Sequence, residues 1–103
     1  MVYSILRTDK ANDQLHEIAQ YILMDSGSVE AALRYVEKIE HAVMLLAEQP
    51  YLGRFPRYST LKKQAYRVLI VEKHLLFYKV NESKKEIVLH AVVDARREYR
   101  SLM

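Results

Sequence analysis

The 103-residue sequence predicts a two-layer α+β domain, in which a helical hairpin packs on an antiparallel sheet. Segments 11–22 and 33–46 carry apolar residues at helical spacing, and the chain from 65 onward is rich in β-branched and aromatic residues. Half of all residues are hydrophobic, with only two glycines and two prolines, which is typical of a compact chain. We expect one domain over residues 1–103, with a β-α-α-β-β-β order.

The N-terminal part predicts a strand followed by a helix. VYSIL, at 2–6, is a short β-rich run. Thr8 or Asp9 then begins the helix, because a side-chain oxygen there accepts a free backbone N–H of the first turn. One helical face collects the apolar residues Ala11, Leu15, Ile18, Ala19 and Ile22.

A second helix follows after a short break. Gly27 suits the positive φ of a helix end, and Ser28 suits the cap of the next helix. The second helix should end near Gln49, because Pro50 disfavours helical geometry in the residue before it. Its predicted apolar stripe is Leu33, Val36, Ile39, Val43 and Leu46. His16 and His41 are expected on the helix surfaces.

The remainder predicts a loop and three strands. Segment 50–59 contains both prolines and Gly53, so it is expected to be an ordered loop. The β-rich runs are 65–71, 74–80 and 86–93. The two-residue spacing at Glu72-Lys73 indicates a tight hairpin, although neither residue is the preferred glycine or asparagine and a longer turn is an alternative. With the helical hairpin on one face of the sheet, the other face is expected to be open for function.

Several classes of protein are excluded or disfavoured. Without cysteine there is neither a disulfide scaffold nor a thiolate metal site, and the histidine spacing predicts no zinc site. Phosphate-loop, dinucleotide-binding and α/β-hydrolase motifs are missing, so no small-molecule cofactor is expected. The sequence shows no signal peptide and no apolar run long enough to span a membrane, which favours a cytoplasmic protein. The net charge of +3 permits an anionic partner without requiring one.

The first candidate functional segment is LKKQAYR at 61–67. Lys62, Lys63 and Arg67 place three cations at the entrance to the predicted sheet. They suit a target- or phosphate-binding role, because arginine can bind a phosphate in a bidentate manner. A solvated loop end is the more common explanation of such a run.

The second candidate is the C-terminal stretch DARREYR, with Arg96, Arg97 and Tyr99. In an extended chain adjacent residues point to opposite faces, so one of the two arginines would reach the open face of the sheet. An arginine and a tyrosine suit a phosphodiester, since they supply charge, a hydroxyl and a stacking ring. A tail that only covers the end of the core is the alternative. His90, inside the last strand, is expected to be partly buried and structural.

These elements in this order resemble the RelE/ParE superfamily, the toxins of bacterial type II toxin–antitoxin modules, often named plasmid stabilisation proteins. The resemblance covers nearly the whole chain. It is carried by A-x3-L-x2-IA-x2-I at 11–22, AxxYxxxIxxAVxxLxxxP at 32–50, YRVLIVEKHLLFYKV at 66–80 and VDARREY at 93–99. It implies a cognate antitoxin whose C-terminal segment wraps the toxin.

The resemblance also implies one of two activities. RelE-like members are metal-independent endoribonucleases that cut mRNA on the ribosome, whereas ParE-like members inhibit DNA gyrase. In the nuclease case, Arg67, Arg96 and Tyr99 match catalytic positions and would supply phosphate binding, charge stabilisation and proton transfer, with Lys62, Lys63 and Arg97 as target- or phosphate-binding residues.

The sequence departs from the nuclease branch at Leu69 and Leu75, where that branch has cations on one sheet face. Cleaving RNA without a metal requires compensation for a dianionic transition state, and each missing cation removes part of it. The long helical hairpin is also more similar to the ParE branch. We therefore expect gyrase inhibition, with the mRNA endoribonuclease and a non-toxic relic acting only as a binding module as alternatives.

Overall fold

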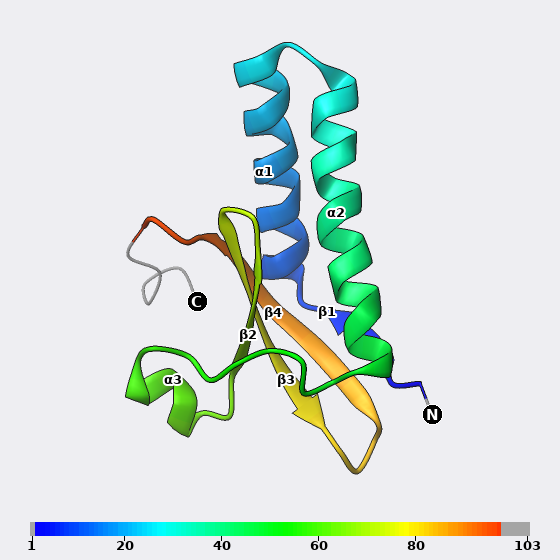
Figure 1. The fold of residues 1–103 in the computed structure, drawn as a ribbon, viewed down its shortest axis with the longest axis vertical. Coiled ribbons are helices and arrows are strands. Elements are labelled where there is room, and N and C mark those ends of the chain that lie inside the picture. The colour runs from blue at the N-terminus through cyan, green and yellow to red at the C-terminus, as the bar shows by residue number, and fades with distance from the viewer. Residues whose placement is uncertain (1, 98–103) are drawn as a thin grey trace.

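The computed structural model describes residues 2–97 of the chain (Figure 1). Its elements follow the predicted order, with one short helix added between the second long helix and the meander. They are β1 (Ser4–Arg7), α1 (Asp9–Ser26), α2 (Val29–Glu48), α3 (Ser59–Lys63), β2 (Arg67–Val71), β3 (His74–Asn81) and β4 (Glu86–Asp94). The predicted fold class is confirmed. Within the described residues, no helix is both long and apolar enough to cross a membrane.

The helical hairpin is capped as the sequence predicts. The Thr8 side chain accepts a hydrogen bond from the backbone N–H of Ala11, and Ser28 caps α2 in the same way. Gly27, with a φ of 68°, closes α1 in the left-handed conformation that glycine adopts without strain. These local signals define the ends of both helices.

The sheet is mixed, with the strand order β1-β4-β3-β2. Strands β2, β3 and β4 form the expected antiparallel meander, and β1 adds to its edge in parallel with β4. The pairing of β3 with β4 shifts next to Phe77 and Tyr78, and His90 is the extra residue. The bulge explains why Leu89 and Val92, three residues apart, both pack in the hairpin-side core.

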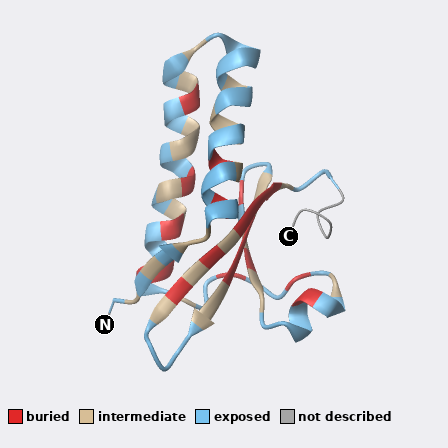
Figure 2. Ribbon diagram, turned by 180° about the vertical axis from the view of Figure 1, so that it is seen from behind, coloured by how far each residue is buried: buried red, intermediate tan, exposed pale blue. Residues whose placement is uncertain are grey.

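The main core lies between the hairpin and the sheet (Figure 2). Ile39 and Leu46 of α2 meet Leu76 and Tyr78 of β3, all fully buried. The half of the hairpin that includes the α1–α2 turn extends beyond the sheet and is mostly exposed. The prediction that Leu33 belongs to the buried stripe is therefore wrong, because Leu33 is 57% exposed and Tyr35 packs inward instead.

The opposite face of the sheet is less open than predicted. Helix α3 begins at the end of the segment expected to be a loop and lays Leu61 against this face. Leu61 contacts a second small core around Phe77, and Tyr58 and Tyr66 pack against it. The sequence signal for α3 was weak, because the helix has only five residues and no side-chain cap.

The β2–β3 connection is the tight two-residue turn rather than the longer alternative. Val71 pairs directly with His74, and Glu72 adopts a φ of 54°. A positive φ is uncommon for glutamate, so the residues of this turn predicted its type only ambiguously.

Candidate functional site

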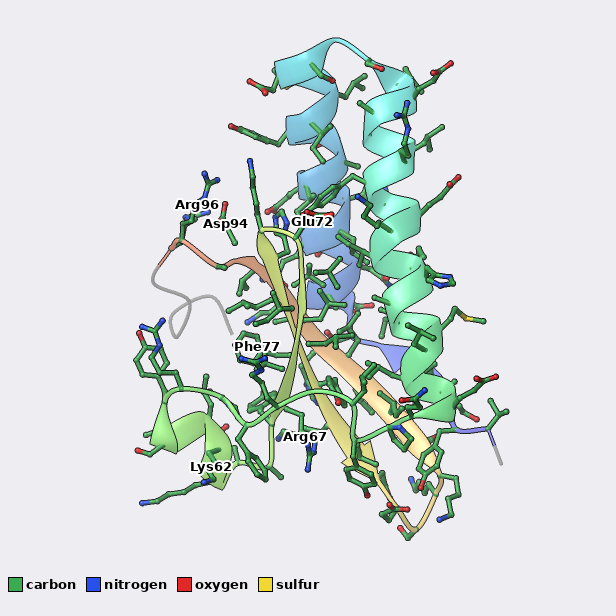
Figure 3. All side chains as sticks on the ribbon, viewed as in Figure 1. Lys62, Arg67, Glu72, Phe77, Asp94 and Arg96 are labelled. Carbon is green, nitrogen blue, oxygen red and sulfur yellow. The ribbon has the colours of Figure 1, made fainter. Side chains whose placement is uncertain are left out.

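The two candidate segments lie at opposite ends of β2 (Figure 3). Arg67 is the first residue of β2, whereas Val71 pairs with His74, which in turn pairs with Asp94. Four residue steps along a strand span about 13 Å. The structure therefore does not bring Arg67 and Arg96 together.

The C-terminal stretch borders a groove of about 830 Å³. The groove lies between the helical hairpin, the β2–β3 turn and the end of β4. We call it the C-terminal groove, and its floor and walls combine apolar and charged side chains. Those used below are Tyr21, Tyr35, Glu72, Lys73, His74, Asp94, Arg96 and Arg97.

Arg96 is held by Asp94 at the rim of the groove. The Asp94 carboxylate accepts hydrogen bonds from Arg96 Nη2 at 2.9 Å, Nε at 3.2 Å and the backbone N–H at 2.8 Å. These bonds, the side-chain ones first, lower the pKa of Asp94 to about 2. The Arg96 side chain is still 69% exposed, so its charge is partly neutralised but its outer surface is accessible.

The chain turns after Asp94 instead of continuing as a strand. The Arg97 backbone N–H donates to the Asp94 carbonyl at 3.2 Å, and Ala95 donates to Lys73 in the β2–β3 turn. The extended geometry expected for Arg96 and Arg97 is therefore wrong. Arg97 lines the same groove as Arg96 and is exposed, whereas Tyr99 lies outside the described residues.

A tyrosine–histidine pair forms another part of the groove. Tyr35 Oη and His74 Nδ1 share a hydrogen bond of 2.6 Å, and their rings meet edge to face at 5.4 Å. Burial lowers the pKa of His74 and raises the pKa of Tyr35. The imidazole is therefore neutral near pH 7, and the pair connects α2 to the start of β3. Sequence reasoning missed both residues, since they are 39 positions apart.

At the other end of β2, Arg67 is engaged with the segment before α3. Its Nη1 donates to the Gly53 carbonyl at 2.7 Å. Its guanidinium lies 4.9 Å from the Tyr51 ring centroid and 4.8 Å from that of Phe55. Tyr78 reinforces this arrangement from the core, because its hydroxyl accepts from the Gly53 N–H and donates to the Pro50 carbonyl, both at 2.9 Å.

The other predicted cations extend outward from α3. Lys62 and Lys63 occupy its last turn and are exposed, and Lys62 Nζ lies 4.9 Å from the Phe55 ring centroid. The prediction that Leu69 and Leu75 share a face is wrong. Leu69 packs toward the hairpin-side core, whereas Leu75 packs in the second core with Phe77.

His90 is partly buried, as expected. Its ring lies edge to face with Tyr66 at 5.4 Å, and burial lowers the pKa of its imidazole. Lys79 Nζ lies 4.4 Å from the Tyr66 centroid and also lowers the pKa of His90. The three residues form a small aromatic and basic cluster on the sheet face opposite the hairpin.

Among residues 2–97, no group of three or more acidic or histidine side chains is placed to hold a metal ion.

The described residues of the two candidate segments form two separate surfaces. A metal-free ribonuclease needs several groups around one phosphate. The two predicted catalytic groups that the structure describes, Arg67 and Arg96, lie at opposite ends of β2, which spans about 13 Å. The C-terminal groove instead combines an accessible arginine pair with apolar helix residues, which suits a protein surface.

The structure resembles the chromosomal ParDE toxin–antitoxin system from P. aeruginosa, with a TM-score of 0.76 and 23% identity over 92% of this chain and 98% of the other. It also resembles the RelBE2 toxin–antitoxin complex from Mycobacterium tuberculosis, with a TM-score of 0.62 and 18% identity over 91% and 99% of the two chains. A comparison with curated proteins gave no significant match. The model of the family described as "ParE toxin of type II toxin-antitoxin system, parDE" matches residues 5–99, which is most of the chain, and this protein belongs to that family.

Proposed function

We propose that this toxin inhibits growth by binding DNA gyrase, rather than by cutting mRNA, and that a cognate antitoxin neutralises it. The observation that carries the proposal is the separation of Arg67 from Arg96 at the two ends of β2. Arg67 is also positioned by the Gly53 carbonyl and two rings, and Arg96 is paired with Asp94. Because of this separation, the two arginines cannot bind the same phosphate.

The surface we assign to the target is the C-terminal groove and the adjoining tip of the helical hairpin. Tyr21 is 69% exposed, Met24 85% and Leu33 57%. Large apolar side chains gathered on the exposed part of two helices favour a protein partner. The exposed guanidiniums of Arg96 and Arg97 would add charge-assisted contacts at the rim.

The antitoxin is proposed to cover this same surface. The two solved relatives are described as toxin–antitoxin systems or complexes, and the groove offers room for a chain segment between α1 and the β2–β3 turn. An acidic segment would meet Lys73, Arg96 and Arg97 there. Toxin bound in this way could not reach its target.

The test compares two assays on the purified wild-type chain and two variants. Supercoiling by purified gyrase should be inhibited by wild type and at least about tenfold more weakly by Arg96→Ala, since the variant loses a charge-assisted contact. Lys84→Ala, an exposed cation in the β3–β4 turn, is the matched control and should inhibit like wild type.

Primer extension on mRNA in a translating extract is the second assay. We expect no new 5′ ends with any of the three proteins. New ends with wild type, absent with Arg96→Ala, would replace the proposal with the ribonuclease. Unchanged supercoiling together with intact mRNA would leave only a binding role.

A further inference from the structure

We propose that a second surface of this toxin binds single-stranded nucleic acid. The surface, called here the basic lobe, consists of Arg54, Phe55, Arg57, Lys62, Lys63 and Arg67. The basic lobe lies at the end of β2 away from the C-terminal groove (Figure 3). Nucleic-acid binding there would be separate from the proposed function, because it does not require gyrase binding.

The charge of the lobe is unusually one-sided. The sequence from Gln49 to Val71 contains five lysines or arginines and no Asp or Glu. Folding brings these residues together, because Arg54 pairs with Val68 of β2 and α3 is the element that precedes β2 in the chain. Arg54, Arg57, Lys62 and Lys63 are all exposed. Such a cluster attracts a polyanion, and each neutralised phosphate releases a counterion.

Exposed rings lie among the cations. Phe55 is 58% exposed and Tyr51 is 49% exposed. Both rings contact the Arg67 guanidinium, and Phe55 also contacts Lys62. Arg67 and Lys62 are therefore positioned beside rings, and neither forms an ion pair with a carboxylate of residues 2–97. Arg67 uses only Nη1 for its hydrogen bonds within the described residues, which leaves its other N–H groups available.

One acidic residue borders the lobe. Tyr51 donates a hydrogen bond to Glu82, which lies in the β3–β4 turn. The Glu82 carboxylate is also paired with Lys85 at 3.0 Å and bonded to Tyr3. Its charge is therefore partly compensated by Lys85 and by hydrogen bonds from the two tyrosines.

The combination of cations and exposed rings selects the ligand. An unpaired base can stack on an aromatic ring while its phosphates meet neighbouring cations, and stacking contributes substantially per base. A duplex keeps its base faces covered, and an acidic peptide gains nothing from a planar ring. The lobe accordingly favours single-stranded DNA or RNA over both.

The binding test uses fluorescence anisotropy with a labelled 20-mer of thymidine or uridine, the duplex of the same length, and polyglutamate as probes. Wild type should bind both single strands. The logarithm of its binding constant should fall with the logarithm of the salt concentration with a slope near −3, as expected for about four phosphate contacts. The triple variant Arg57→Ala, Lys62→Ala, Lys63→Ala should bind at least about tenfold more weakly, with a slope near −1. Phe55→Leu should lose about tenfold affinity with the slope unchanged, because stacking rather than charge is removed.

A second triple variant, Lys10→Ala, Arg34→Ala, Lys84→Ala, makes the same change in net charge at exposed positions elsewhere and should bind like wild type. Circular dichroism checks that every variant is folded. Equal weakening by the two triple variants would overturn the proposal, because charge alone would then explain binding. Equal or tighter binding of the duplex or polyglutamate would overturn it as well, and so would no binding of wild type at 50 mM salt.

Discussion

The two ends of β2 use the same type of side chain in opposite ways. At the Arg96 end, two cations near the β2–β3 turn have carboxylate partners, Arg96 with Asp94 and Lys38 with Glu72, both at 2.9 Å. At the Arg67 end, the arginine binds a backbone carbonyl and two aromatic rings. A carboxylate cancels the charge of its partner, whereas a ring or carbonyl leaves most of it in place. Position in the fold, more than residue type, determines how much charge each arginine presents to a partner.

The largest expected effect comes from crowding the Arg67 end. A Cβ on Gly53 would lie 2.6 Å from Tyr78 Oη and 2.7 Å from the Val68 carbonyl oxygen. Gly53→Ala should therefore lower the free energy of unfolding by about 3 kcal/mol, because backbone must move. Urea denaturation measures the change.

Gly27→Ala is the control for that variant. A Cβ there meets nothing within 4 Å, so only the left-handed φ of 68° is penalised, at about 1 kcal/mol. Equal losses for the two variants would show that the close contacts around Gly53 are not restrictive.

Removing one hydroxyl at the same end should have a smaller effect. Tyr78→Phe leaves the Gly53 N–H and the Pro50 carbonyl without their shared partner in the core. We expect a loss of about 1–2 kcal/mol in the free energy of unfolding. Hydrogen exchange should locate the loss, with faster exchange at Gly53 and unchanged exchange in α1. Uniformly faster exchange would contradict a local role for the hydroxyl.

The Arg96 end should respond to pH. The folded pKa of Asp94 is about 2, below its ordinary value of 3.8, so its stabilising contribution is complete above about pH 4 and is lost as the pH falls toward 2. Asp94→Asn removes this contribution. Between pH 4 and pH 2.5 the urea midpoint of wild type should therefore fall more than that of the variant. Parallel curves would contradict the lowered pKa.

The smallest effect is expected for the exposed pair between α2 and the β2–β3 turn. Lys38 and Glu72 have side chains that are 58% and 50% exposed. Surface ion pairs of this kind contribute little, and salt screens them. Glu72→Gln should leave the urea midpoint within experimental error, in low and in high salt. A clear loss at low salt would show that this pair, unlike most on a surface, holds the turn against α2.

Sequence patterns predicted local features better than the face toward which a residue points. The caps at Thr8 and Ser28 and the ending at Gly27 depend on neighbouring residues, so the sequence identified them. Leu33 was misplaced because helical spacing cannot show where the sheet beneath the helix ends. Leu69 and Leu75 were assigned to one face. In the hairpin Leu69 pairs with Leu76, so Leu75, the neighbour of Leu76 in β3, points to the opposite face.

The candidate site shows the same division. Arg96 and Arg97 were found from their own stretch of sequence, and both line the C-terminal groove. Tyr35 and His74 were missed, because only the packing of α2 on the β2–β3 turn brings them together. The roles of Phe55 and Tyr51 were hidden for a similar reason, since their contacts with Arg67 cross from the loop to β2.

The parallel pairing of β1 with β4 has a consequence for synthesis. Ser4 pairs with Glu86 and Arg7 with Leu89, so the first described strand of the domain lies against its last. Until the residues of β4 have left the ribosome, β1 has no neighbour in the sheet, and this pairing has the greatest loop-closure cost of the three. The four-stranded sheet can therefore form only late in synthesis of the domain.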